Sequence, residues 1–90
     1  MNDTHTPGNA IVTGSASGLG RAIAVRLAQD GYRIALVDID DDANRETLAL
    51  VEARGGNGRV EHVDVSDPEA WRELIDRLRN DWPQLDLLVN

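Results

Sequence analysis

Hydrophobic residues fall into two kinds of segment that alternate along the chain. Two continuous apolar runs, residues 9–13 and 33–38, are typical of strands buried on both faces. A third run, residues 58–65, alternates apolar with polar positions and predicts an edge strand with one wetter face. Residues 85–90 predict the start of a fourth strand.

Helical spacing appears in each segment between these runs. Apolar and small residues recur every three or four positions over residues 19–30, and Gly31 follows as a C-terminal stop. The next segment begins with aspartates 40–42, which the positive end of a helix dipole favours. Leu48 and Val51 mark its apolar stripe, and a glycine pair predicts its end.

The third helical segment carries the clearest start signal. Ser66 or Asp67 is the expected N-cap, Pro68 suits the first turn, and Glu69 stands three residues after Ser66, as in a capping box. Its predicted apolar face consists of Trp71, Leu74, Ile75, Leu78 and Trp82. Alternation of strands and helices with short connections predicts an α/β fold with a parallel sheet, half of a doubly wound domain.

Length and composition narrow the class of protein. Ninety residues suffice for one small domain, and the absence of cysteine excludes disulfides and thiolate metal sites. Residues 1–8 are polar and do not resemble a signal peptide, so we expect a flexible tail before a domain at 9–90. No apolar run approaches membrane-spanning length, and the cytoplasm is the expected location. The net charge of −7 argues against nucleic acid or an anionic membrane as partner.

The turn after the first strand is rich in glycine. Gly14, Gly18 and Gly20 separate a strand from a helix, so the backbone can approach an anion and leave the first helical N–H groups free. Asp38 ends the next strand, eighteen residues after Gly20, where a ribose diol needs an acceptor. This context predicts a dinucleotide site, although the same glycines could serve a tight turn alone. Arg21 follows Gly20 where a P-loop needs lysine, which excludes a nucleoside-triphosphate loop.

The stretch "TGSASGLG", Thr13 to Gly20, resembles the T-G-x-x-x-G-x-G signature of the classical short-chain dehydrogenases/reductases. Asp38, the "DVSD" at residues 64–67, and "LDLLVN", which is similar to the approach to the family's N-N-A-G motif, follow in order. The resemblance covers residues 9–90. It implies half of a Rossmann fold with parallel strand order 3-2-1-4.

The resemblance also implies a set of cofactor-binding residues. Those expected to line the pyrophosphate and adenosine ribose are Gly14, Ser17, Gly18, Leu19 and Gly20. Asp38 would accept hydrogen bonds from the ribose hydroxyls, with Ile39 beside the adenine. Asp64 would meet the adenine amino group, the Val65 N–H a ring nitrogen, and Asn90 the adenosine ribose. Two structural alternatives stay open: Asp64 could help to cap the next helix, and Asn90 could be an ordinary strand residue.

The expected cofactor is NAD rather than NADP. The 2′-phosphate of NADP is an anion, and Asp38 with the aspartates at 40–42 would repel it. The nearest cation along the chain, Arg45, lies within the following predicted helix.

Family members move a hydride between NAD(H) and an alcohol or carbonyl carbon with a Tyr-x-x-x-Lys pair. This chain has no lysine, and its one tyrosine, Tyr32, precedes the second strand at the end away from the cofactor, so we interpret it as structural. No catalytic residue is therefore predicted within the chain; the resemblance places the catalytic residues beyond Asn90 and implies a homo-oligomeric full-length enzyme acting on a small alcohol or carbonyl compound. The alternative is a free-standing nucleotide-binding or interaction module without chemistry.

No metal site is predicted. Asp38, Asp40 and Asp42 imitate the start of a calcium loop, but Ala43 replaces its glycine. The two histidines, His5 and His62, have no partner at ligand spacing and are interpreted as solvated or hydrogen-bonded residues.

Overall fold

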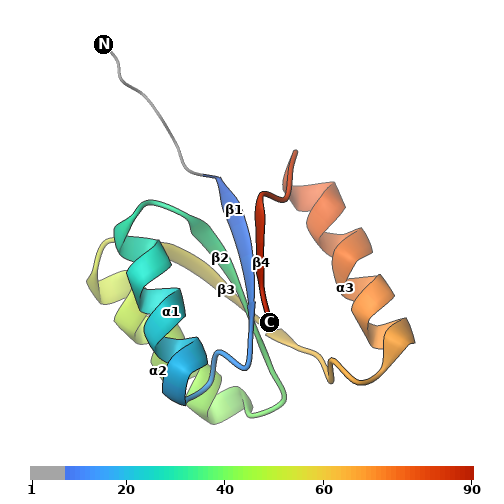
Figure 1. Ribbon diagram of the computed structural model, residues 1–90, viewed down its shortest axis with the longest axis horizontal. Helices are drawn as coiled ribbons and strands as arrows, with labels where there is room; N and C mark the ends of the chain where they lie inside the picture. Colours follow the sequence, from blue (N-terminus) through green and yellow to red (C-terminus); the bar gives the residue numbers. More distant parts are fainter. Residues whose placement is uncertain (1–7) are drawn as a thin grey trace.

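In the computed structural model, which describes residues 8–90, strands and helices alternate as the hydrophobic pattern predicts (Figure 1). The elements are β1 (Asn9–Thr13), α1 (Gly18–Gln29), β2 (Arg33–Asp38), α2 (Asp41–Ala53), β3 (Asn57–His62), α3 (Pro68–Asp81) and β4 (Leu87–Val89). The strands form one parallel sheet in the order β3-β2-β1-β4. Both the α/β half-Rossmann architecture and its predicted strand order are confirmed.

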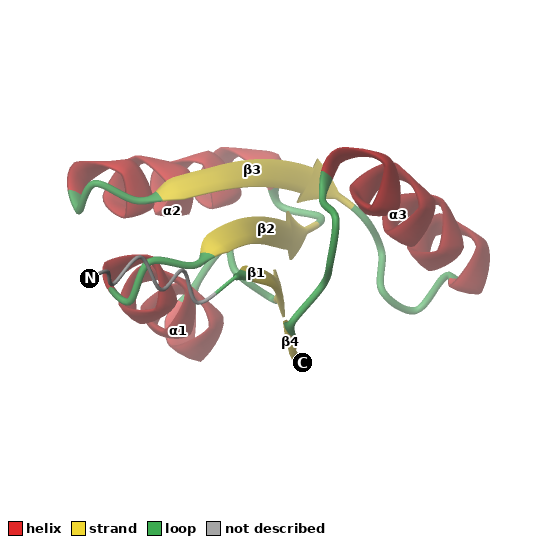
Figure 2. Ribbon diagram, turned by 90° about the horizontal axis from the view of Figure 1, so that it is seen from above, coloured by secondary structure: helices red, strands yellow, loops and turns green. Residues whose placement is uncertain are grey.

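The sheet lies between two helical layers. Helices α1 and α2 cover one face and α3 covers the other (Figures 1 and 2). Side chains of β1 and β2 alternate between these faces, because successive residues of a strand point to opposite sides. The cluster on the α3 face contains Ile11, Ala35, Val37, Val63, Leu74, Leu78 and Trp82. The cluster on the α1 and α2 face contains Val12, Ala24, Ala28, Ile34, Leu36 and Val51.

Two strands have bounds that differ from the sequence prediction. The third was expected to reach residue 65, but β3 stops at His62, which pairs with Asp38 at the end of β2, so no backbone partner remains beyond it. The fourth was expected from residue 85, but β4 begins at Leu87, after Asp86 has bound Asn9. Asp86 donates its N–H to the Asn9 carbonyl (2.9 Å) and accepts from the Asn9 N–H through its carboxylate (2.8 Å). The Asp86 carboxylate thereby accepts the Asn9 N–H in place of a backbone carbonyl, just before the hydrogen-bond ladder between β1 and β4 begins.

Aspartates cap the second and third helices. Asp40 accepts from the Ala43 N–H (3.1 Å) at the start of α2. At α3 the N-cap is Asp67, which accepts from the N–H groups of Glu69 (3.0 Å) and Ala70. The expected capping box from Ser66 to Glu69 is therefore wrong, because Ser66 lies one residue before the cap and binds Asp64 instead.

The buried stripe of α2 is more polar than predicted. Val51 is buried and Leu48 partly buried, as expected, but Asn44 and Thr47 are also fully buried on this helix. Buried polar groups require hydrogen-bond partners. Their partners lie at the glycine-rich turn, described below.

Residues 1–7 lie outside the described part of the chain, and with them His5 and most of the predicted tail. Within residues 8–90, no helix has the length and apolar character needed to cross a membrane.

Candidate functional site

Because all four strands run parallel, their carboxyl ends meet at one edge of the sheet. Every residue predicted to bind the cofactor lies at this edge, either at the end of β2 (Asp38) or on the segments that follow β1, β2, β3 and β4. These residues are Gly14, Ser17, Gly18, Leu19, Gly20, Asp38, Ile39, Asp64, Val65 and Asn90.

The glycines of the turn after β1 meet two different constraints. Gly14 and Gly18 have φ angles of 68° and 57°, in the left-handed region that glycine occupies without steric cost. Gly20 has no such constraint, but a Cβ atom there would overlap the backbone carbonyl of Gly14 and lie 2.6 Å from its carbon. The turn thus needs glycine for conformation at two positions and for close approach at the third.

Helix α1 begins without a side-chain cap. Its N-cap residue, Ser17, makes no side-chain capping hydrogen bond, and its first turn holds no acidic residue. The other two helices are both capped by aspartate. The first N–H groups of a helix have no intrahelical acceptor and carry partial positive charge, so this end of α1 suits an anion.

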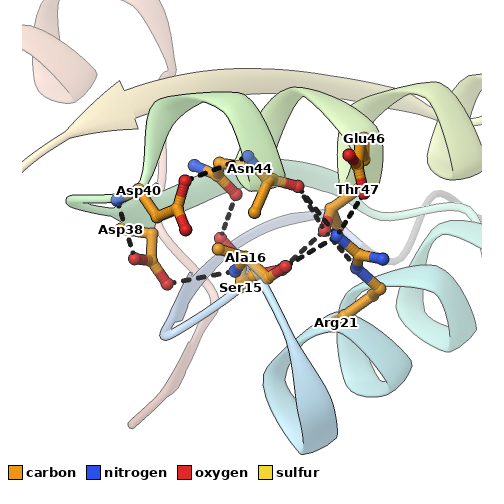
Figure 3. A network of polar contacts seen from close by, with 9 residues as sticks. Ser15, Ala16, Arg21, Asp38, Asp40, Asn44, Glu46 and Thr47 are labelled. Atoms are coloured by element: carbon orange, nitrogen blue, oxygen red, sulfur yellow. Dashed lines mark hydrogen bonds and ion pairs between the residues drawn. The ribbon is translucent and has the colours of Figure 1, made fainter.

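The Asp38 carboxylate faces the glycine-rich turn. One oxygen accepts from the Ala16 N–H (3.1 Å) and the other from the Asp40 N–H (3.0 Å), which fixes its orientation (Figure 3). A carboxylate has about four lone-pair positions, so hydroxyl donors can still bind. Arg45, the cation singled out from the sequence, is paired with Asp42 at 2.8 Å.

Three apolar side chains at this edge are unusually exposed. Among residues 8–90, the three most exposed large hydrophobic side chains are Leu19 (76%), Ile39 (60%) and Val65 (51%). Exposed apolar side chains gathered at one place typically mark a binding surface. They follow β1, β2 and β3 respectively, where an apolar ring could lie against them.

Asp64 forms a local turn and does not cap α3. Its Oδ1 accepts from the Ser66 hydroxyl (2.6 Å) and the Ser66 N–H (2.9 Å). These two hydrogen bonds, the hydroxyl first, lower the pKa of Asp64 below the ordinary 3.8. The carboxylate therefore remains charged, and as an acceptor, throughout the neutral pH range.

Asn90 is positioned from β1. Its side-chain oxygen accepts from the Thr13 hydroxyl at 3.0 Å. With Val65, Trp71 and Leu88, Asn90 lines a hollow of about 240 Å³. The hollow brings together two predicted site residues, Val65 and Asn90, from segments 25 positions apart.

Sequence reasoning missed three polar side chains behind the glycine-rich turn: Arg21 of α1, and Asn44 and Thr47 of α2. They bind Ser15 and Ala16 in a network drawn in Figure 3. One signal could have shown the two residues of α2, because Asn44 and Thr47 follow helical spacing on the same face as Val51. Polar residues within an apolar stripe indicate a buried polar contact.

The remaining candidates have structural contacts. Tyr32 is half-buried against the cluster beneath α1 and α2, at the start of β2. The His62 Nδ1 lies 2.7 Å from an Asp41 carboxylate oxygen, which confirms the hydrogen-bonded interpretation. No group of three or more His, Asp or Glu that could hold a metal occurs in the described residues.

Comparison with known proteins places the chain in a family. The sequence profile of the family described as short chain dehydrogenase matches residues 8–90. A diacetyl reductase ((S)-acetoin forming) of Staphylococcus epidermidis is 41% identical over 81 residues, covering 90% of this chain and 32% of that protein. The chain spans only about 30% of the length of the curated relatives it matches.

Solved structures agree with this assignment. An NAD⁺-bound xylitol dehydrogenase is 31% identical with a TM-score of 0.87, covering 96% of this chain and 33% of that one. A metagenomic short-chain oxidoreductase in complex with NADP is 28% identical with a TM-score of 0.88, covering 92% and 38% respectively. From its glycine signature, its sheet order and these matches, the chain belongs to the short-chain dehydrogenase family.

Proposed function

We propose that this chain is the NAD-binding part of an oxidoreductase that acts on an alcohol or carbonyl compound. The observation that carries the proposal is the uncapped start of α1 beside the Asp38 carboxylate. The helix start suits the pyrophosphate, and the Asp38 carboxylate suits the ribose hydroxyls. The hydrogen bond from the Ala16 N–H to Asp38 keeps the glycine-rich turn and the carboxylate together.

The residues at this edge fit a dinucleotide. A side chain at Gly20 would push the turn away from α1, so glycine there keeps the phosphate-binding backbone close to the helix. Ile39 offers exposed apolar surface to the adenine, the Val65 N–H meets a ring nitrogen, and Asp64 offers a charged acceptor to the amino group. Leu19 lines the pyrophosphate and the adenosine ribose. Gly14, Ser17 and Gly18 complete the pyrophosphate site, and Asn90 lies at the adenosine ribose.

The proposed cofactor is NAD, although related structures hold NAD⁺ or NADP. A 2′-phosphate at Asp38 would meet a carboxylate fixed in place by two backbone N–H groups. Repulsion between anions is strong where water is partly excluded. Arg45 is bound to Asp42 and would have to leave that partner to neutralise the phosphate.

Bound NAD supplies the hydride acceptor, or NADH the donor, for the alcohol or carbonyl substrate. The chain holds no lysine for the family's Tyr-x-x-x-Lys pair, and Tyr32 is packed at the opposite end of β2. We therefore assign the proton transfer to residues that this chain does not contain. A cytoplasmic, homo-oligomeric enzyme remains the expected context.

The test compares the dissociation constants of NAD and NADP by calorimetry, for the wild-type chain and for Asp38→Ala with Ile39→Arg. Wild type should favour NAD by at least about tenfold, and the double variant should shift the ratio toward NADP by a similar factor. Glu73→Ala is the matched control, because it removes one exposed negative charge from α3, a helix that holds none of the predicted cofactor-binding residues. A wild-type preference for NADP would contradict the cofactor assignment, and binding of neither would favour a non-catalytic interaction module.

A further inference from the structure

Helix α2 holds the glycine-rich turn from behind. The Thr47 hydroxyl donates to the Ser15 carbonyl at 2.7 Å, and the Ser15 hydroxyl donates to the Asn44 side-chain oxygen at 2.7 Å. Ser15, Asn44 and Thr47 are all fully buried. Asn44 is itself fixed, since its amide nitrogen donates to the Leu36 carbonyl of β2 at 2.8 Å.

Arg21 joins the turn to both helices (Figure 3). Its Nε donates to the Thr47 hydroxyl (2.9 Å), and its Nη2 donates to the carbonyls of Ala16 (2.7 Å) and Ala43 (2.9 Å). It also lies 3.4 Å from Glu46, which is exposed. The guanidinium is therefore used mainly to bind backbone and hydroxyl oxygens.

These contacts determine where the N–H groups of the turn point. A peptide group is planar and trans, so its C=O and N–H point in opposite directions. Thr47 fixes the Ser15 carbonyl toward α2, and the N–H of the same peptide group, that of Ala16, points away to Asp38. Arg21 fixes the Ala16 carbonyl, so the Ser17 N–H of the same peptide group points in the opposite direction.

We propose that Thr47 and Arg21 are positioning residues for the dinucleotide: neither touches it, but each orients a peptide group whose N–H serves the site. Thr47 keeps the Ala16 N–H on the Asp38 carboxylate, and Arg21 aims the Ser17 N–H toward the phosphate. Asn44 supports both by fixing Ser15. The inference rests on the proposed NAD site and adds supporting residues behind it: Arg21 from α1, and Asn44 and Thr47 from α2.

The experiment measures the binding of ADP-ribose to the 90-residue chain, together with hydrogen exchange at the Ala16 amide. Thr47→Val keeps the shape of the side chain but removes the hydroxyl, and should weaken ADP-ribose binding about tenfold and speed exchange at Ala16. Thr47→Ser should restore both. The matched control is Val51→Ala, which destabilises the same helix from a fully buried position without contacting the turn. At a temperature where the Val51→Ala chain is folded, it should bind ADP-ribose with wild-type affinity.

Arg21 variants provide the second arm and are expected to fold, because this side chain is partly exposed. Arg21→Met and Arg21→Lys should both weaken ADP-ribose binding, since lysine keeps the charge but cannot reproduce the planar fork of donors. Wild-type affinity for ADP-ribose in Arg21→Lys would overturn this inference but not the proposed function. So would a Thr47→Val chain whose affinity matches that of Val51→Ala. A wild-type chain that does not bind ADP-ribose would overturn the proposed function as well.

Discussion

The backbone of Gly20 lies directly against the carbonyl of Gly14, so that a methyl group at position 20 would lie 2.6 Å from the Gly14 carbonyl carbon. This contact joins the first turn of α1 to the residue that follows β1. It holds the start of the helix close to the end of the strand. The geometry of the proposed phosphate site depends on that closeness.

Gly20→Ala should therefore displace the turn and abolish measurable NAD binding, with a clear fall in melting temperature. Gly18→Ala is the informative comparison, because its φ of 57° strains an alanine by roughly 1–2 kcal/mol but nothing lies within 4 Å of the new methyl group. Calorimetric titration and thermal unfolding measure the two effects. Equal losses of affinity in the two variants would contradict a special role for the contact.

The N-cap residues of α3 and α1 should differ in how much they stabilise the fold. Asp67→Ala removes the acceptor for the Glu69 and Ala70 N–H groups and should cost about 0.5–2 kcal/mol in unfolding free energy. Ser17→Ala removes no capping hydrogen bond and should change stability by less than about 0.5 kcal/mol. Urea unfolding distinguishes these outcomes. A Ser17→Ala loss as large as that of Asp67→Ala would show that Ser17 does cap α1.

The pKa of Asp64 should depend on Ser66. It lies below the ordinary 3.8 because the Ser66 hydroxyl and N–H bind the carboxylate. A carboxyl group with a lowered folded-state pKa stabilises the fold above the unfolded value, and that contribution is lost as pH falls through the folded value. In an NMR titration, Ser66→Ala should move the Asp64 midpoint up toward 3.8, though not fully, because the backbone donor remains. Ser17→Ala should leave it unchanged.

The sheet edge at β4 should promote self-association of the 90-residue chain. β4 pairs with β1 on one side only, and Leu88 is 48% exposed. Strand edges with exposed apolar side chains pair readily with other chains. Leu88→Lys should raise the monomer fraction in sedimentation experiments at high protein concentration. A wild-type chain that stays monomeric there would refute this prediction.

The 90-residue chain should not oxidise alcohols or reduce ketones at any pH. Hydride transfer to or from a carbonyl carbon needs a positioned group that moves the accompanying proton, and the chain holds neither lysine nor a tyrosine at the cofactor edge. NADH absorbance with a panel of alcohols and ketones provides the assay. Turnover that co-purifies with the chain would mean that an acid–base group within residues 1–90 has been overlooked.

Sequence pattern alone predicted the order of the strands and helices, the edge position of β3 and a glycine-rich turn between the first strand and the first helix. Apolar spacing follows directly from helix and strand geometry, and left-handed turns require glycine, so these features are local. The family resemblance added the strand order, and the sheet confirms it. The individual cofactor contacts remain predictions, although all ten residues lie at one edge.

Tertiary structure decided what local patterns could not. β3 ends at His62 because β2 ends at Asp38, and the alternating pattern that continues to Val65 cannot reveal the length of the partner strand. In the same way, helical spacing places Asn44 and Thr47 on the buried face of α2 with Val51, but it cannot identify their partner, the turn after β1, which lies about thirty positions earlier. Hydrogen bonds between segments so far apart depend on how the layers meet, because a side chain is buried by its neighbours in space and not by its neighbours in sequence.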